Sequence, residues 1–155
     1  MSGIEVALVD EHFMHGKVAV SWCSYCDSHL IIVVNDQLVG DKTRQGLLEM
    51  AVPDEISTRF YSIDKALKKL NELSDNKHAV IITETLGDLL KLTDAGIKIP
   101  RVVLSRIPYG TGEKRLSTNI SLSEAHISAL KELSKEGIDI QSRQTPDEEN
   151  DILPI

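Results

Sequence analysis

The sequence has little of several residue types, and each scarcity excludes a class of protein. It holds two cysteines, Cys23 and Cys26, which are too few and too close together for a disulfide framework. Its 17 basic and 24 acidic side chains give a net charge of −7, the wrong sign for a protein whose affinity comes from neutralising nucleic-acid phosphates. The longest purely apolar run, Leu30 to Val34, is far too short to span a bilayer. The acidic N-terminus also lacks the basic and apolar regions of a signal peptide. We therefore expect a cytoplasmic protein without a nucleic-acid partner.

What is present is typical of one globular domain. Hydrophobic residues make up 41% and charged residues 26% of 155 residues, and a chain of this length buries roughly 70% of its unfolded surface. The sequence carries no internal repeat or linker, so we expect a single domain over residues 1–155. Four acidic residues between Asp147 and Asp151 predict a solvated, partly ordered tail over residues 145–155.

Short runs rich in β-branched residues alternate with amphipathic segments, a pattern typical of βαβ units. The run at 29–35 is apolar on both faces, which indicates a covered strand in the middle of a parallel sheet. Right-handed crossovers then predict a doubly wound open α/β sheet, mainly parallel, with helices on both faces. Ile138 and Ile140 alternate with polar residues, and we expect them in an antiparallel edge strand. The other expected strands are 5–9, 29–35, 59–62, 79–82 and 101–104.

Capping residues and apolar spacing predict the helices. Asp41 is the expected N-cap of a helix that runs to about Ala51, with Leu47, Leu48 and Ala51 on its buried side. Asp64 is the expected cap of the next helix. The remaining expected helices are 16–23, 86–94 followed by Gly96, and 124–135 followed by Gly137.

The loop after the first expected strand is the candidate reactive site. Reactive loops of such sheets lie beyond the carboxyl ends of the strands, where helix N-termini present unpaired N–H groups. His15 directly precedes Gly16, which opens a helix and lets the backbone approach a ligand. Its imidazole would be the nucleophile for a phosphoryl group held by those N–H groups. Asp10 would orient the ring by accepting a hydrogen bond from its other nitrogen.

Asn35 and Asp36 follow the second expected strand and would face the same strand end. These features alone leave a second interpretation open, in which His12 and His15 are ordinary loop histidines, because short histidine-glycine combinations are common.

Two of these segments together carry a family resemblance. Residues 10–18 read D-E-H-F-M-H-G-K-V, and residues 31–36 read I-I-V-V-N-D. The pair resembles the D-x-R-x-x-H-G-Q-V and I-V-V-N-D patterns of the IIB component in the mannose/fructose/sorbose family of the bacterial phosphoenolpyruvate-dependent sugar phosphotransferase system. The resemblance continues through segments 21–22, 47–53, 110–114 and 143–144, so it spans nearly the whole chain.

The resemblance implies a protein-histidine phosphotransferase that needs no metal or other cofactor. His15 would take a phosphoryl group from the histidine of a IIA component. It would pass the group to a sugar carried by the membrane components IIC and IID, so the protein would be cytoplasmic and peripherally associated with the membrane. Mannose, fructose, sorbose and N-acetylated amino sugars all remain open as the sugar, and a homo-oligomer is compatible with the resemblance.

The chain departs from the family pattern at two positions of the reactive loop. His12 replaces the arginine that would hold the phosphoryl group by a charged fork, and Lys17 replaces a glutamine. We expect Gly16, His12 and Lys17 to bind the phosphate, with Lys17 supplying the missing cation.

Alternatives from other classes stay open. One is a non-catalytic or regulatory relative that binds the phosphotransferase-system partners. Another is a zinc-binding interaction domain built from Cys23, Cys26 and nearby histidines. However, the helix over 16–23 would hold the H-x-x-H pair and the C-x-x-C pair about 10 Å or more apart. We expect Trp22 to pack in the core. Phe13 and Met14 are candidates for an apolar docking patch for IIA, or they pack down onto the sheet.

Overall fold

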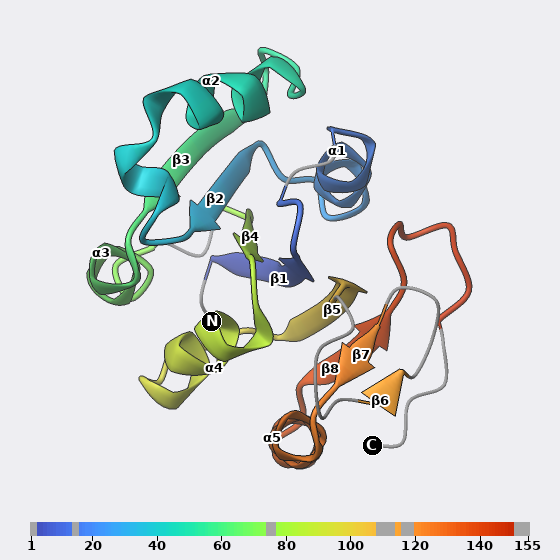
Figure 1. Cartoon of the computed structure of the whole chain (residues 1–155). Helices are drawn as coiled ribbons and strands as arrows, with labels where there is room; N and C mark the ends of the chain where they lie inside the picture. Colours follow the sequence, from blue (N-terminus) through green and yellow to red (C-terminus); the bar gives the residue numbers. More distant parts are fainter. Residues whose placement is uncertain (1–2, 14–15, 74–76, 108–113, 116–119, 151–155) are drawn as a thin grey trace.

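The computed structural model describes residues 3–13, 16–73, 77–107, 114–115 and 120–150. Its centre is a six-stranded sheet in the order β3-β2-β4-β1-β5-β8 (Figure 1). Every pairing between neighbouring strands of this sheet is parallel. The strands are β1 (Ile4–Asp10), β2 (Leu30–Val34), β3 (Ser57–Tyr61), β4 (Ala79–Thr83), β5 (Arg101–Arg106) and β8 (Asp139–Ser142).

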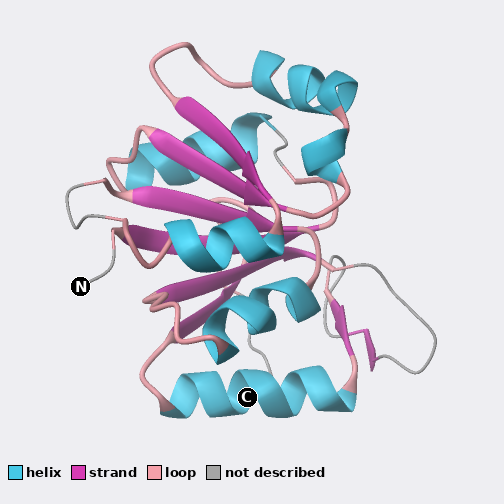
Figure 2. Cartoon of the chain, turned by 90° about the vertical axis from the view of Figure 1, so that its left-hand side faces the viewer, coloured by secondary structure: helices cyan, strands magenta, loops and turns pink. Residues whose placement is uncertain are grey.

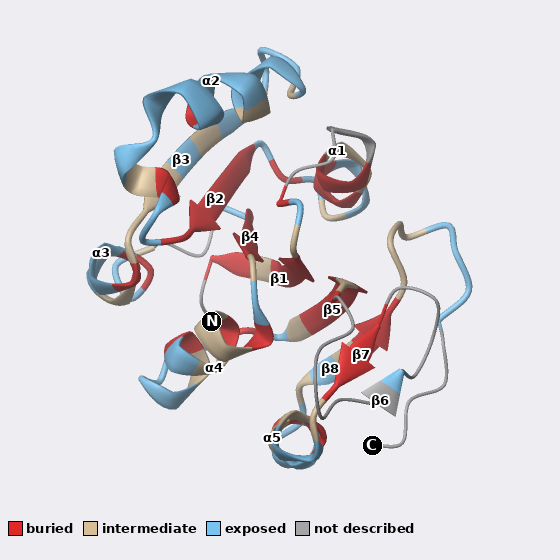
Figure 3. Cartoon of the chain, viewed as in Figure 1, coloured by how far each residue is buried: buried red, intermediate tan, exposed pale blue. Residues whose placement is uncertain are grey.

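Helices cover both faces of the sheet, as predicted (Figure 2). One face packs against α1 (Gly16–Tyr25), the short 3₁₀ helix η1 (Leu38–Gly40) and α2 (Lys42–Met50). The other face packs against α3 (Ile63–Lys69), α4 (Leu86–Asp94) and α5 (Glu124–Lys135). All residues of β2 and β4 are buried, because helices lie above and below them (Figure 3).

Strand β8 lies at the sheet edge but runs parallel to β5, with Arg101 opposite Asp139 and Leu104 opposite Ser142. The predicted antiparallel direction is therefore wrong. A parallel return needs a crossover along the length of the sheet, and the twelve-residue helix α5 supplies it. Antiparallel pairing within the described ranges occurs between two short strands outside this sheet, β6 (Lys114–Arg115) and β7 (Ser121–Leu122).

Helix α2 buries less than its apolar residues suggested. Asp41 caps it as predicted, since its Oδ1 accepts the Arg44 N–H at 3.0 Å. However, Leu47 is 63% exposed, Ala51 is exposed and Leu48 is half-buried. The buried residue is Gln45, whose Nε2 donates to the Leu38 carbonyl at 2.8 Å. The prediction of buried side chains is therefore wrong for Leu47 and Ala51, because no described element covers the outer side of α2 (Figure 3), whereas Leu48 packs partly against the core.

The remaining helices begin and end close to the predicted positions. Asp64 is not the cap of α3, because Ser62 takes that role by accepting the Lys65 N–H at 3.1 Å, and Asp64 lies in the first turn. The helix therefore begins two residues earlier than expected, at buried Ile63. Helices α4 and α5 have the predicted bounds. Gly96 and Gly137 follow them at φ +90° and +92°, a conformation that suits glycine.

Candidate functional site

Asp10 lies at the carboxyl end of β1, in the middle of the sheet, and is only 1% exposed. Its Oδ2 accepts the Ser105 hydroxyl at 2.8 Å, and its Oδ1 accepts the His12 backbone N–H at 2.8 Å. Both carboxylate oxygens are thus engaged, which fixes the side chain in one orientation. A buried carboxylate is stable only with such partners.

The next residues lead from Asp10 to the start of α1 at Gly16, where the sequence predicted a helix to open. His15 and Met14 lie outside the described residues, as does the side chain of Lys17. The structure therefore places the two ends of the reactive loop. Asp10 lies at one end, and the N-terminus of α1 lies at the other, where the first N–H groups of an α-helix have no partner within the helix itself.

Phe13 turns the chain inside this loop. It has φ +56° and is 1% exposed, packed on the α1 and α2 side of the sheet. The Arg44 guanidinium carbon lies 4.9 Å from the centre of its ring, a cation–π contact that ties α2 to the loop. Of the two alternatives left open for Phe13, the structure shows the one in which it packs down onto the sheet.

Three charged or polar side chains meet beside Asp10. The Glu11 Oε1 atom lies 3.2 Å from the Arg106 Nε and 3.5 Å from the His12 Nε2. The Glu11 backbone N–H also donates to the Arg106 carbonyl at 3.1 Å. His12 is about half exposed, so this group faces solvent at the strand ends. The structure thus brings Arg106 from β5 to the loop that holds His12.

Asn35 and Asp36 lie at the same carboxyl ends of the strands as Asp10, but they are not next to it. Strand β4 separates β2 from β1, and Thr83 pairs with both Val9 and Val34. The Asn35 Oδ1 accepts the Leu38 N–H at 2.9 Å, and the Asp36 Oδ1 accepts the Ile63 N–H at 2.8 Å. These bonds hold η1 and the start of α3, so both residues shape the second loop.

Ser105 and Glu11 belong to the candidate site through their contacts with Asp10 and Arg106, and the sequence did not identify them. Ser105 is a buried polar residue at the end of the apolar run Val102–Leu104, directly at the carboxyl end of β5. That position is a usable signal, because a polar residue closing a buried strand needs a partner. Nothing in the sequence indicates that Glu11 pairs with a residue 95 positions away.

Helix α1 is anchored to the C-terminal region through Trp22, which is buried in the core as predicted. Its Nε1–H donates to the Gln144 carbonyl at 2.9 Å, and the Arg143 guanidinium carbon lies 5.3 Å from the centre of its ring. Segment 143–144, which carries part of the family resemblance, therefore packs against the helix that follows the reactive loop.

The cysteines have the properties of packed residues. Burial raises the pKa of the Cys23 thiol to about 11, and burial also raises the pKa of Cys26. Both thiols therefore stay protonated near neutral pH, whereas zinc binding and redox exchange use the thiolate. Among the residues with described positions, no three His, Cys, Asp or Glu side chains gather as a metal site would require.

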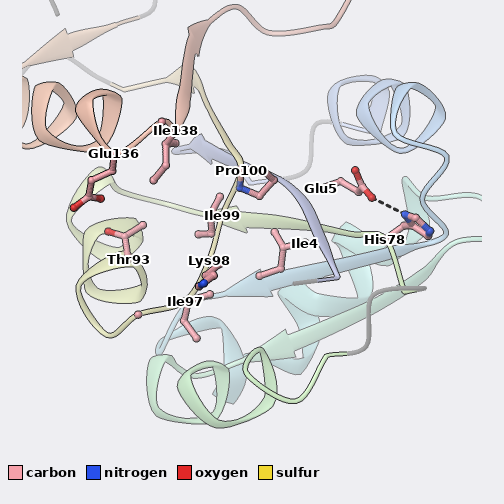
Figure 4. Close-up of a pocket in the computed structure, with 12 residues that line it drawn as sticks. Ile4, Glu5, His78, Thr93, Ile97, Lys98, Ile99, Pro100, Glu136 and Ile138 are labelled. Carbon is pink, nitrogen blue, oxygen red and sulfur yellow. Dashed lines mark hydrogen bonds and ion pairs between the residues drawn. The ribbon is translucent and has the colours of Figure 1, made fainter. Parts of the chain in front are cut away.

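A cavity of about 720 Å³ lies at the opposite end of the sheet, where the strands begin (Figure 4). Ile4, Ile99 and Ile138 line it from the amino ends of β1, β5 and β8. A contact between Glu5 and His78 lies beside these apolar residues. None of the predicted site residues lines this cavity. Parallel sheets place their reactive groups at the carboxyl ends, so we assign the cavity no catalytic role.

The family model of the phosphotransferase-system sorbose subfamily IIB component matches residues 4–154. The chain therefore belongs to the sorbose subfamily of phosphotransferase-system IIB components, a family of phosphotransferases that act in sugar phosphotransfer.

Individual relatives agree with this. The chain is 26% identical over 148 residues to the N-acetylgalactosamine-specific phosphotransferase enzyme IIB component 2 of Escherichia coli, covering 96% of this chain and 94% of that one. It is 25% identical to the E. coli mannose-specific EIIAB component, covering 91% of this chain and 44% of that longer one. The crystal structure of the E. coli N-acetylgalactosamine-specific IIB component 1 has the same fold, with a TM-score of 0.87, 22% identity and 97% and 99% of the two chains covered.

In the part of the chain that the structure describes, no helix has the length and apolar character needed to cross a membrane.

Proposed function

We propose that this protein is a phosphohistidine relay in sugar uptake, with His15 as the residue that carries the phosphoryl group. The observation that supports this most is the position of Asp10. It is buried and held by two hydrogen bonds at the end of β1, five residues before His15. Helix α1 opens directly after His15. A rigid acceptor on one side and a helix N-terminus on the other suit a phosphorylated imidazole.

In the proposed reaction the phosphoryl group moves between two nitrogen atoms. The N–P bond to the donor histidine of a IIA component breaks as an N–P bond to His15 forms. In the second step that bond breaks as a sugar hydroxyl, losing its proton, forms a P–O bond at the membrane IIC and IID components. In-line transfer of this kind needs positioning and charge stabilisation.

Each predicted site residue has a role in this proposal. Asp10 orients the His15 ring by accepting from the nitrogen that does not attack. The Gly16 N–H, the Lys17 ammonium and His12 hold the phosphoryl oxygens. Asn35 and Asp36 support the neighbouring loop through the bonds they make to η1 and α3.

A IIA component is the proposed donor because the chain matches part of a mannose-specific EIIAB component, whose name combines the two components. The acceptor sugar lies within the class named by the relatives, which includes N-acetylgalactosamine, fructose, mannose and sorbose. The protein would work at the cytoplasmic side of the membrane, docked to the transporter components.

The test is transfer of labelled phosphate from phosphoenolpyruvate through enzyme I, the phosphocarrier and a IIA component to this protein. Acid-labile label should appear on the parent and not on His15→Ala. His29→Ala is the matched control and should accept label like the parent, because His29 is exposed and precedes β2 at the amino ends of the strands. Absence of label on the parent, with phosphorylated IIA present, would refute the relay and favour a partner-binding or regulatory role.

A further inference from the structure

The position at which the family pattern has an arginine is occupied here by His12, and an arginine from another strand lies beside it. The Arg106 Nε and the His12 Nε2 both contact the same oxygen, Glu11 Oε1, at 3.2 and 3.5 Å. We propose that Arg106 supplies the guanidinium that holds the transferring phosphoryl group. It would replace the arginine that the family pattern has at the position of His12. This inference rests on the relay function proposed above.

The backbone places Arg106 at the carboxyl end of β5, on the same end of the sheet as Asp10. Arg106 is the last residue of β5, and it pairs with Asp10 after a register shift between Val9 and Asp10. The Glu11 N–H donates to the Arg106 carbonyl at 3.1 Å. The Arg106 side chain therefore starts from the strand end next to the proposed orienting carboxylate. It is 39% exposed, so an incoming donor protein can reach it.

The chemistry of the two side chains explains why one would replace the other. An imidazole offers at most two N–H donors, on opposite sides of its ring. A guanidinium is always charged and offers five donors in a planar fork that matches phosphoryl oxygens. The contact with Glu11 uses Nε, and the two terminal nitrogens carry the four other N–H bonds of the fork.

Glu11 positions Arg106 and balances its charge before phosphate arrives. Its carboxylate carries one negative charge, whereas a phosphoryl group on a histidine carries up to two. Arrival of the phosphoryl group therefore favours a shift of the guanidinium toward it. Without Glu11 the exposed arginine would sample many rotamers, and more side-chain entropy would be lost on each transfer.

The experiment measures the initial rate of His15 phosphorylation by phosphorylated IIA in four variants. Arg106→Gln should lower the rate at least tenfold, about the loss expected for one charged donor to a transferring group. Arg106→Lys keeps the charge but loses the planar fork of donors, and its rate should lie between those of the parent and of Arg106→Gln. Arg101→Gln is the matched control, because Arg101 stands on the same strand with an acidic partner, Asp139, at 3.5 Å. Its rate should stay within about twofold of the parent.

The decisive variant combines His12→Arg with Arg106→Gln. If the guanidinium is what matters, restoring the arginine of the family pattern at position 12 should return the rate to within about threefold of the parent. A structural role for Arg106 would not be rescued in this way. Thermal unfolding of each variant checks folding, and Arg106→Lys serves as the test if Arg106→Gln does not fold.

Failure of the inference and failure of the relay give different results. A parent-like rate for Arg106→Gln, with label still on His15, overturns the role of Arg106 and leaves the relay intact. If the parent takes no label at all, the relay fails. In that case, titration with inorganic phosphate, followed by NMR at the backbone amides of residues 11–17, tests whether Arg106 contributes to an anion-binding site. Weaker phosphate binding in Arg106→Gln supports it, and unchanged binding overturns it.

Discussion

The Ser105 hydroxyl donates to the Asp10 Oδ2 at 2.8 Å, and both residues are 1% exposed although they lie 95 positions apart. The bond joins the carboxyl ends of two neighbouring strands at the centre of the sheet. It occupies one oxygen of the carboxylate while the other accepts the His12 N–H. The orientation of Asp10 is thus set by the sheet itself.

Ser105→Ala should reduce both stability and phosphoryl transfer. The variant leaves a buried carboxylate oxygen without its hydroxyl partner, which costs about 1–3 kcal/mol in the free energy of unfolding. Urea denaturation measures this loss, and the label assay measures transfer. The matched control is Ser28→Ala, which removes a buried hydroxyl bonded to the Leu30 carbonyl away from the site. Equal transfer by the two variants at equal stability would contradict a positioning role for Ser105.

Trp22→Phe should loosen the C-terminal segment that packs on α1. The change removes the Nε1–H donor to the Gln144 carbonyl and weakens the stacking of Arg143. We expect a loss of about 1–3 kcal/mol in the free energy of unfolding, with faster hydrogen exchange at residues 143–150. Tyr25→Phe is the control, since Tyr25 is 55% exposed. Unchanged exchange at 143–150 in Trp22→Phe would show that the indole does not hold this segment.

Leu47→Ala on α2 should leave the free energy of unfolding within about 0.5 kcal/mol of the parent, because Leu47 is 63% exposed. Leu70→Ala is its counterpart at a fully buried site, at 2% exposure. It should cost about 2–5 kcal/mol through the cavity it leaves. Similar losses for both variants would mean that the outer side of α2 is covered.

The buried Cys23 thiol should make stability fall in alkaline solution. Burial raises the pKa of Cys23 from 9.0 to about 11 in the folded protein, so the folded state holds this proton more tightly than the unfolded state. The resulting stabilisation is complete below pH 9 and is lost as the pH rises through 11. Chemical denaturation between pH 8 and 11 should therefore show a shallower decline for Cys23→Ala than for the parent. If the free energy of unfolding fell equally with pH in both proteins, the ionisation of Cys23 would not contribute to the alkaline loss of stability.

Much of the architecture follows from local signals. Helices α4 and α5 have the predicted bounds because a side-chain cap, a leucine stripe and a left-handed glycine mark each of them. The direction of β8 could not be read in the same way. Alternation of Ile138 and Ile140 indicates an edge strand but carries no information on direction. Likewise, the spacing of Leu47 and Leu48 indicates an apolar face, but not whether anything covers it.

The candidate site was predictable only where one segment holds it. Asp10 and the opening of α1 at Gly16 could be placed because they end a strand and start a helix in one loop. The separation of Asn35 and Asp36 from Asp10 could not, because β4 inserts between β1 and β2 only in the folded sheet. The contacts of Glu11 and Ser105 with β5 depend on strand order for the same reason.

The measurement that tests the central claim most directly is mass spectrometry of the protein after incubation with phosphorylated IIA, under alkaline conditions that preserve phosphohistidine. The account predicts one phosphoryl group, localised to His15 and lost when membrane vesicles with IIC, IID and the sugar are added. A phosphoryl group on His12 or another residue, or none at all with phosphorylated IIA present, would contradict it.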